Sequence, residues 1–246
     1  GMLGPMLVQV PGHLLREKGY LARTEVTLVK VPTKMDHKIR NWHQVYSQGI
    51  VQHRPRNSAI LSLVDHLWRA GRRSLVFVGQ KDHGRALLVA CARMGMPALF
   101  SSGGGKMERV TDADTGELLT EKWDVARLAA YVETKEPSIV IATQVLDEGV
   151  DVPHFDSCII GVGHKKMRRL LQRIGRGMRP KEGDRALHVF DFHDQQHWML
   201  RRHAKARQAT YAEEKIPVVD LDTVCRSMGL DGAHLRYNLD YDKGVP

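Results

Sequence analysis

Apolar and polar positions alternate along this chain in blocks of different period. Short runs rich in apolar residues recur at 74–79, 97–101, 138–143, 158–162 and 186–192, and each has the length of one strand. A strand that is apolar on both faces is typical of a parallel sheet covered on both sides. These runs therefore predict the strands of a parallel sheet.

Segments with helical spacing lie between the predicted strands. They cover residues 82–94, with Asp82 as the N-cap, and residues 123–134, 167–179 and 195–214. Residues 106–120 depart from this alternation, because Asp114-Thr115-Gly116 lies between two β-prone stretches and indicates a hairpin. Strands that alternate with helices predict an α/β fold, with a parallel sheet and helices on both faces.

The two ends of the chain are interpreted separately from this domain. Residues 1–50, which contain an expected strand at 24–31, are assigned to an N-terminal extension or interdomain segment. Residues 51–214 form the α/β domain, and residues 215–246 a final strand and tail. A chain of 246 residues is long enough to bury one sizeable core with such extensions.

Composition places the chain among ordinary globular proteins. Hydrophobic residues make up 42% and charged residues 26%. No apolar run approaches the roughly 18 residues of a membrane span, and no signal peptide is evident, so we expect a cytoplasmic protein. The three cysteines are too few and too scattered for a disulfide framework or zinc site, and Cys91 and Cys158 lie in apolar runs typical of a core. No metal site is predicted.

The formal net charge of +9 is concentrated in one region. Residues 163–207 hold thirteen Lys and Arg against four Asp and Glu, which accounts for the whole excess. A confined positive field favours a polyanion such as nucleic acid or a nucleotide, although a solvated basic face is the alternative. The same alternative applies to the predicted helix at 195–214, where basic residues either contact DNA or form a solubilising face. Those residues are Arg201, Arg202, Lys205 and Arg207.

The segment Gln172-Arg173-Ile174-Gly175-Arg176-Gly177-Met178-Arg179-Pro180 has two faces when it is read as a helix. The apolar face holds Leu171, Ile174 and Met178. The other face holds Gln172, Arg176 and Arg179. Pro180 disfavours helical angles at Arg179, which places that side chain at the helix terminus. Because a guanidinium binds phosphate oxygens bidentately, this segment is predicted to bind polyphosphate.

Ligands of a parallel sheet bind beyond the carboxyl ends of its strands. The strand at 138–143 ends at Thr143, whose hydroxyl and amide can hydrogen-bond a phosphate. Gly149 permits a tight turn and Asp151 presents a carboxylate, although an ordinary turn explains these two residues equally well. Asp147-Glu148 is better read as a pair of helix-turn carboxylates without chemistry.

Taken together, these segments resemble the motifs of superfamily 2 helicases. The stretch from Ile139-Val140-Ile141-Ala142-Thr143 to Asp147-Glu148-Gly149-Val150-Asp151-Val152-Pro153 resembles motif V, and residues 172–179 resemble motif VI. The two occur in the family's order, with a strand between them. Leu75-Val76-Phe77-Val78 resembles the motif IV strand, and residues 100–103 stand where the family has a loop that touches the nucleic-acid backbone. The resemblance covers roughly residues 20–215 and implies the second, RecA-like domain of such a helicase.

The residue types narrow the resemblance. DEAD-box RNA helicases usually have His at the first position of motif VI and Ala-Arg-Gly-Leu-Asp in motif V. This chain has Gln172 and Asp147-Glu148-Gly149-Val150-Asp151, which is more similar to UvsW-like phage and bacterial DNA helicases and to the motor subunits of restriction enzymes. DNA is therefore the expected partner rather than RNA. The hairpin at 106–120 departs from the family's short loop, and the resemblance leaves open translocation polarity and whether the pathway is repair, recombination or restriction.

A helicase motor also needs a Walker A loop, G-x-x-x-x-G-K-[ST], and Walker B acids for magnesium. The nearest candidate is Gly103-Gly104-Gly105-Lys106, but Phe100 stands at the first glycine position and Met107 at the hydroxyl position. We therefore expect ATP and Mg²⁺ to be held by a first RecA-like domain of the same polypeptide, with Mg²⁺ ligands outside this chain.

The resemblance implies a role for each matching residue. Arg179 would act as the arginine finger, Arg176 as a second phosphate contact, and Gln172 would orient the site. ATP or interface contacts are assigned to Gly149, Asp151 and Arg173. Nucleic-acid contacts are assigned to Thr143, Ser101, Ser102, Gly103, Gln80 and Lys81. Alone, the chain would bind nucleic acid weakly and hydrolyse nothing. Two alternatives remain: a non-catalytic nucleic-acid-binding module with a RecA-like fold, and a self-contained P-loop enzyme using residues 103–106.

Overall fold

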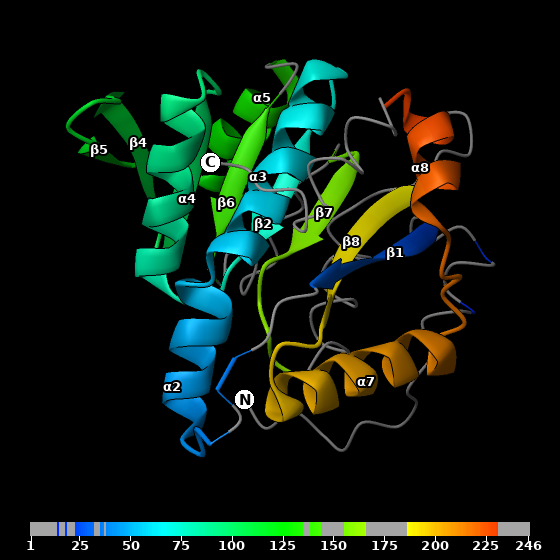
Figure 1. Ribbon diagram of the computed structural model, residues 1–246. Helices are drawn as coiled ribbons and strands as arrows, with labels where there is room; N and C mark the ends of the chain where they lie inside the picture. The colour runs from blue at the N-terminus through cyan, green and yellow to red at the C-terminus, as the bar shows by residue number, and fades with distance from the viewer. Residues whose placement is uncertain are drawn as a thin grey trace, which may run out of the picture.

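One mixed sheet organises the chain (Figure 1). The computed structural model describes residues 23–31, 35–36, 38–134, 138–143, 155–165 and 186–230, together with Leu14 and Lys18. In these residues the sheet has eight strands, in the order β1-β8-β7-β2-β6-β3-β4-β5. The strands are β1 (Thr24–Val31), β2 (Ser74–Phe77), β3 (Ala98–Gly103), β4 (Lys106–Asp112), β5 (Glu117–Lys122), β6 (Ile139–Ala142), β7 (Ser157–Ile160) and β8 (Leu187–Asp194).

Parallel pairing runs from β1 through β3, as the apolar runs predict. β2 lies at the centre, with Ser74 paired to Ile139 of β6 on one side and to Ser157 of β7 on the other. Every position of β2, β6 and β7 is buried, because helices cover both faces. The pairings of β3 with β4 and of β4 with β5 are antiparallel, and β4 and β5 form the predicted hairpin at one edge of the sheet.

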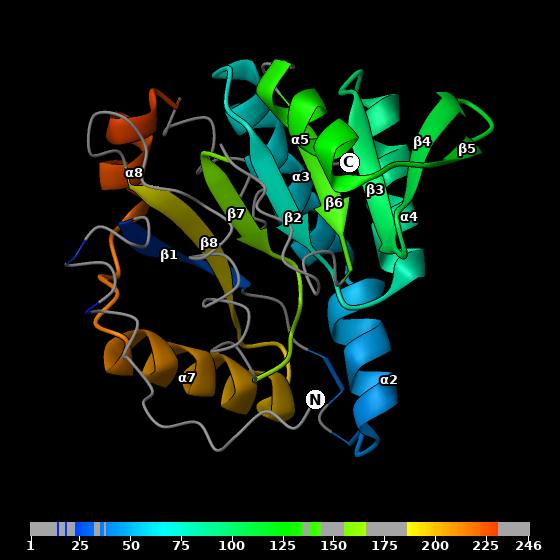
Figure 2. The ribbon, with the colours of Figure 1, turned by 180° about the vertical axis from the view of Figure 1, so that it is seen from behind.

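Helices cover both faces of the sheet. They are α2 (Trp42–Tyr46), the π-helix η1 (Ser47–Val51), α3 (Arg54–Arg69), α4 (Lys81–Arg93), α5 (Val125–Thr134), α7 (Trp198–Glu213) and α8 (Leu221–Met228). Helices α3, α4 and α8 pack on one face (Figure 1) and α5 on the other (Figure 2). Tyr211 of α7 belongs to the hydrophobic core on the same face of the sheet as α5, while Leu200 of the same helix packs against α2 and η1. No described helix is long and apolar enough to cross a membrane.

The structure adds two findings about the ends of the chain. The strand at 24–31, assigned to a segment outside the domain, is edge strand β1 and pairs along its whole length with β8. The final strand expected after residue 214 is reduced, in the described part, to one bridge between Val26 and Val218, followed by α8. Helix α8 forms because Asp220 caps its first turn and Gly229 ends it in the left-handed conformation.

Helix starts also differ from the sequence pattern. Helix α4 begins at Lys81 with Gln80 as the N-cap, so Asp82 lies in the first turn, where a carboxylate still favours the helix dipole. Neither α2 nor η1 is predicted from the pattern. Helix α2 depends on Asn41, whose side chain accepts hydrogen bonds from the amides of His43 and Gln44 at 2.8 and 3.3 Å.

Core residues agree with the sequence pattern at most positions. Cys91 and Cys158 are buried, and Trp68 and Trp123 pack against the two cores. Trp198 is 39% exposed at the start of α7, with the guanidinium of Arg40 5.9 Å from its ring. It therefore lies at the surface.

Candidate nucleotide and nucleic-acid interface

The carboxyl ends of the three central strands lie side by side. Phe77 at the end of β2 pairs with Ala142 of β6 and with Ile160 of β7. The stretch that resembles motif V begins in β6 and continues beyond Thr143, where the described residues end, and the stretch that resembles motif VI follows β7 beyond Lys165. Both segments thus leave the described structure one strand away from β2, on opposite sides.

Six of the predicted site residues lie outside the described residues. They are Gly149, Asp151, Gln172, Arg173, Arg176 and Arg179. The other six, namely Gln80, Lys81, Ser101, Ser102, Gly103 and Thr143, lie at the carboxyl edge between and beside the two departure points.

Gln80 and Lys81 occupy the start of α4, directly after β2. Both side chains are exposed, and Gln80 makes no side-chain capping hydrogen bond. The first amides of a helix carry a partial positive charge and face an incoming anion. With the ammonium group of Lys81 beside them, these amides give the edge an electrostatic preference for phosphate.

The loop after β3 combines buried hydroxyls with an exposed glycine turn. The amide of Thr143 donates to the carbonyl of Ser101 at 3.3 Å, so these two residues adjoin. Ser101 and Ser102 are only 4% and 8% exposed, whereas the chain reaches solvent at Gly104. Direct contact with a nucleic-acid backbone is therefore more accessible to the turn than to the two hydroxyls.

The glycine run joins two antiparallel strands. Gly103, Gly104 and Gly105 have φ values of 92°, 64° and 71°, which side chains other than glycine rarely adopt. A P-loop instead leads from a strand into a helix, whose first amides face the phosphates. The turn at 103–105 therefore lacks the geometry of a phosphate-binding P-loop.

An aromatic–histidine cluster adjoins the loop after β2. It consists of Trp42, Tyr46, His164 and His203. The rings of Tyr46 and His164 stack 4.8 Å apart at 13°, and Trp42 lies 4.4 Å from His203. A Cβ on Gly79 would collide with the Tyr46 hydroxyl, so the cluster packs directly against this loop. The sequence pattern does not predict the cluster, and its one local signal is the helical spacing of Trp42 and Tyr46.

Burial controls the charge of this cluster. Burial lowers the pKa of His164, and the neighbouring His203 and Arg207 lower it further. Burial also lowers the pKa of His203, while a hydrogen bond to the Gly163 backbone partly opposes that shift. Both rings are therefore neutral near pH 7 and add apolar surface to this edge rather than charge.

A buried arginine network, formed by Arg56, Arg207, Asp191, Asp194 and Tyr211, lies behind the same edge. Arg56 Nε donates to Asp194 Oδ1 at 2.8 Å, and Arg207 Nε donates to Asp191 Oδ2 at 2.8 Å. Arg207 Nη2 also donates to Asp194 Oδ2 at 3.1 Å, and the Tyr211 hydroxyl donates to Asp191 Oδ2 at 2.8 Å. Arg207 is fully buried, so the expectation that it belongs to a solvated or DNA-contacting face is wrong.

The network also holds the chain that leaves β7. Arg56 donates to the carbonyls of Gly161 and Ile160 at 2.7 and 3.3 Å, and Arg207 donates to that of His164 at 3.5 Å. Burial opposes the charge of Arg207, but Asp191 and Asp194 outweigh it and raise the pKa of Arg207 above its ordinary value. Arg207 therefore remains charged, and the two arginines together hold the backbone between Ile160 and His164.

Exposed basic residues remain on α7. Arg201, Arg202 and Lys205 are exposed near the carboxyl end of β8. Their exposure is compatible with a contact to DNA and equally with a solubilising face. Among the described residues, no group of three or more His, Cys, Asp or Glu side chains could hold a metal ion.

Comparisons with known proteins point to one family. A sequence profile described as the helicase conserved C-terminal domain matches residues 58–181. No curated protein shows a significant match.

Two solved structures illustrate the similarity of the fold. UvsW of phage T4 has a TM-score of 0.61 at 17% identity, covering 82% of this chain and 41% of UvsW. A variant of Dbp5 from S. cerevisiae, bound to RNA and ADP BeF3, has a TM-score of 0.50 at 14% identity, covering 90% of this chain and 46% of Dbp5. The chain spans less than half the length of either protein, and what it shares with them is the fold.

Proposed function

The chain belongs to the family of helicase conserved C-terminal domains, and on that premise we propose that it is the second motor domain of an ATP-dependent superfamily 2 DNA helicase or translocase. Its α/β sheet is the RecA-like domain of superfamily 2 helicases. The proposal extends this family membership to a reaction, to a nucleic acid and to individual residues.

One observation carries the proposal. The segments that resemble motifs V and VI depart from β6 and β7, on either side of β2, whose own end leads to Gln80 and Lys81. Residues far apart in the sequence are thereby directed to one edge of the sheet, where ligands of parallel sheets bind.

In the proposed mechanism, ATP and Mg²⁺ are held mainly by the first RecA-like domain of the same polypeptide, which carries the Walker loops. Arg179 approaches the transferring phosphoryl group and stabilises the charge that develops on its oxygens, with Arg176 as a second contact. Such arginine fingers contribute roughly 10³ to 10⁵ in rate. Gln172 and Arg173 orient the interface, and Gly149 with Asp151 contacts the nucleotide or the facing domain.

The described edge fits a polyanion. Its first helical turn has no side-chain cap, Lys81 is exposed, and the glycine turn at 103–105 brings backbone amides to the surface. We assign the nucleic-acid backbone to this part of the edge, with Thr143 beside it. DNA is favoured over RNA by Gln172 and by the sequence of the motif V segment.

The decisive experiment uses a polypeptide that contains this chain and its Walker domain. Arg179→Ala should lower the turnover number of DNA-stimulated ATP hydrolysis by about 10³ or more, with DNA affinity changed less than a few-fold. Lys181→Ala is the matched control, because it removes a neighbouring positive charge outside the motif. Unchanged turnover in Arg179→Ala would instead support the non-catalytic binding module.

The isolated chain provides a second test. It should bind single-stranded DNA weakly, more tightly than RNA of the same sequence, and hydrolyse no ATP above background. DNA-stimulated hydrolysis that Lys106→Ala abolishes would show a self-contained P-loop enzyme and overturn the proposal.

A further inference from the structure

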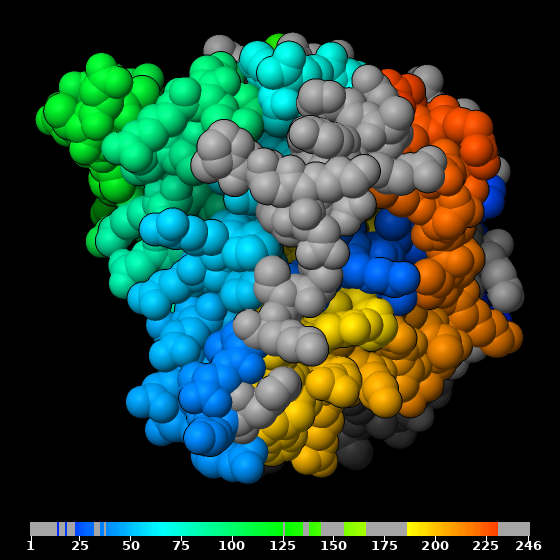
Figure 3. Space-filling view, viewed as in Figure 1, coloured from blue at the N-terminus to red at the C-terminus, as the bar shows by residue number. Residues whose placement is uncertain are grey.

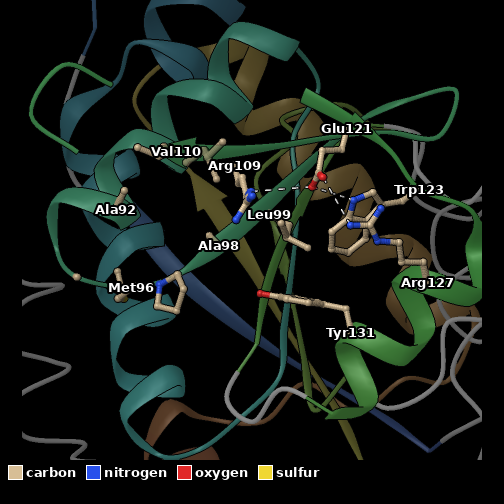
Figure 4. Close-up of a pocket in the computed structure, with 13 residues that line it drawn as sticks. Ala92, Met96, Ala98, Leu99, Arg109, Val110, Glu121, Trp123, Arg127 and Tyr131 are labelled. Carbon is tan, nitrogen blue, oxygen red and sulfur yellow. Dashed lines mark hydrogen bonds and ion pairs between the residues drawn. The ribbon is translucent and has the colours of Figure 1, made fainter. Parts of the chain in front are cut away.

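A pocket of about 500 Å³ lies where β4 diverges from β3 (Figure 4). The two strands pair only near their connecting turn, from Phe100 to Gly103 on β3. Beyond that point they separate, and the gap opens toward the amino end of β3. Its walls come from α4, the turn before β3, β4, the end of β5, and α5.

The hairpin that forms one wall is clamped to α4. Arg85 makes two hydrogen bonds to the carboxylate of Glu108, at 2.7 and 3.0 Å. Arg93 donates to the carbonyls of Ala113 and Asp114, at 3.0 and 3.3 Å, near the hairpin tip. Although the hairpin projects at one end of the molecule (Figure 3), its position is fixed. A pocket with fixed walls binds a ligand at a small ordering cost.

The rim of the pocket carries more positive than negative charge. Arg109 and Arg127 lie on either side of Glu121, at 3.9 and 3.6 Å, and each arginine side chain is 53% exposed. Neither guanidinium donates a hydrogen bond to any described residue, although that of Arg127 lies over the Trp123 ring, 4.3 Å from its centroid. The indole nitrogen of Trp123 donates to Glu121 at 3.3 Å. Two guanidiniums therefore share one carboxylate and keep N–H groups available to an anion.

The floor is apolar and aromatic. It is formed by Met96, Leu99, Val110, Trp123 and Tyr131. The rings of Trp123 and Tyr131 meet edge to face at 5.6 Å, and the Tyr131 hydroxyl points into the pocket (Figure 4). No described residue hydrogen-bonds that hydroxyl. Burial raises the pKa of Tyr131, so the phenol stays a neutral donor.

This combination selects the chemistry of the ligand. Available donors at the rim require an acceptor that carries negative charge, and the floor requires a bulky apolar group close to it. In a peptide, only the C-terminal residue carries an apolar side chain and a carboxylate on the same Cα atom. The pocket also lies toward the amino ends of the parallel strands, away from the edge assigned to nucleotide and nucleic acid.

We propose that this pocket binds the C-terminal residue of an acidic partner peptide, with the side chain of an aromatic or large aliphatic residue on Trp123 and Leu99. The α-carboxylate accepts hydrogen bonds from Arg109 and from the Tyr131 hydroxyl. Acidic residues that precede it face the rim guanidiniums of Arg109 and Arg127. A partner held in this way leaves the carboxyl edge of the sheet accessible.

The test measures fluorescence anisotropy of a fluorescein-labelled hexapeptide, Asp-Glu-Asp-Glu-Leu-Phe with a free carboxyl terminus, against the whole 246-residue chain at low salt. Binding should be saturable in the micromolar range, and the C-terminal carboxamide should bind at least tenfold more weakly. N-acetyl-phenylalanine should compete only at concentrations at least a hundredfold higher. Equal binding of acid and amide overturns the proposal, as does equal affinity for N-acetyl-phenylalanine, which would show a small-acid site.

Variants locate the binding in the pocket. Arg109→Gln removes a positive charge from the rim, and Ala92→Trp fills the space between α4 and the floor, so each should weaken peptide binding at least fivefold. Lys122→Gln is the matched control, because Lys122 is exposed and strand alternation directs it to the face opposite Glu121. Peptide binding unchanged in both pocket variants places the peptide elsewhere and overturns the proposal. Since the assay needs neither ATP nor nucleic acid, its outcome is independent of the proposed motor function.

Discussion

Two regions of the molecule use arginine in opposite ways. At the end of β8, Arg56 and Arg207 have fully buried side chains and hydrogen-bond to carboxylates and carbonyls at 2.6 to 3.5 Å. Beside the hairpin, Arg109 and Arg127 are half exposed, and their nearest carboxylate is 3.6 to 3.9 Å away. The comparison separates arginines that hold the fold from arginines that remain available to a ligand.

Burial explains the difference. A buried charge is tolerated only with close partners, so removing one member of a buried pair leaves a costly unpaired charge. An exposed pair is screened by water and contributes little to stability. A count of basic residues along the sequence therefore overstates the charge available to nucleic acid, because the positive charge of Arg207 is buried and compensated by Asp191 and Asp194.

The largest effect is expected for Arg207→Met. The substitution leaves Asp191 buried without its arginine partner and Asp194 with Arg56 alone, and it should lower the free energy of unfolding by about 3 to 5 kcal/mol. Urea denaturation followed by circular dichroism measures this change. Arg201→Met, at an exposed position of the same helix, should stay within about 0.5 kcal/mol. If the two variants unfold at the same urea concentration, the buried network does not hold the fold together.

Arg56→Lys tests geometry rather than charge. The ammonium group retains the positive charge but cannot bond Asp194, Gly161 and Ile160 in the directions of the guanidinium fork. We expect a loss of about 2 kcal/mol in the same denaturation assay. Arg54→Lys, at the exposed start of α3, is the control and should leave the midpoint unchanged. A stability equal to that of the original chain would show that charge alone suffices.

The pH dependence of stability provides a further test of the buried region, through the buried side chain of His83. Burial, together with the nearby Arg56, lowers the pKa of His83 to about 3, whereas the unfolded chain titrates near the ordinary value of 6.5. Below pH 6.5 the unfolded state binds a proton at His83 that the folded state does not bind. The free energy of unfolding should therefore fall by about 1.4 kcal/mol for each pH unit below 6.5, or by about 2 kcal/mol at pH 5.

The contribution of His83 appears as a difference between variants. Urea midpoints measured between pH 7.5 and 5 should depend less on pH in His83→Gln than in the original chain. His43→Gln, on the exposed side of α2, should leave the pH dependence as it is. Identical pH profiles for all three proteins would contradict the assignment to His83.

The smallest effect on stability is expected at the hairpin. Glu121→Gln keeps an acceptor for Trp123 and should change the free energy of unfolding by less than about 0.5 kcal/mol. Because it removes the only carboxylate shared by Arg109 and Arg127 among the described residues, it should strengthen binding of the acidic hexapeptide about threefold. If Glu121→Gln instead weakens binding of the hexapeptide, the acidic residues of the peptide do not lie against Arg109 and Arg127.

The strands were the most predictable part of the molecule. Runs such as 74–77 and 139–142 are apolar at nearly every position because both faces are covered, and a run that is this short and this apolar is typical of a buried parallel strand. Asp114-Thr115-Gly116 likewise predicted the hairpin, since Asp112 closes the turn through hydrogen bonds to the amides of Asp114 and Thr115. Local sequence was sufficient at these places.

Features that depend on contacts distant in the sequence could not be predicted. Arg207 is separated from Arg56 by most of the chain, and its position on α7 resembles that of its exposed neighbours Arg201 and Lys205. Its burial follows only from the carboxylates on β8. The aromatic–histidine cluster and the pocket behind the hairpin are likewise made by elements that no local pattern connects. For residues 172–179, which lie outside the described residues, the prediction that arginines bind the phosphates of ATP rests on the sequence resemblance.

The pairing of β1 with β8 can form only late in translation. Thr24 pairs with Leu187, so β1 emerges from the ribosome long before its partner exists. At about 5 to 20 residues per second, the strand waits on the order of ten seconds or more with its backbone unpaired. During that interval the nascent chain exposes apolar side chains of β1 that the folded protein buries. The completed edge of the sheet is thus among the last parts of this protein to form.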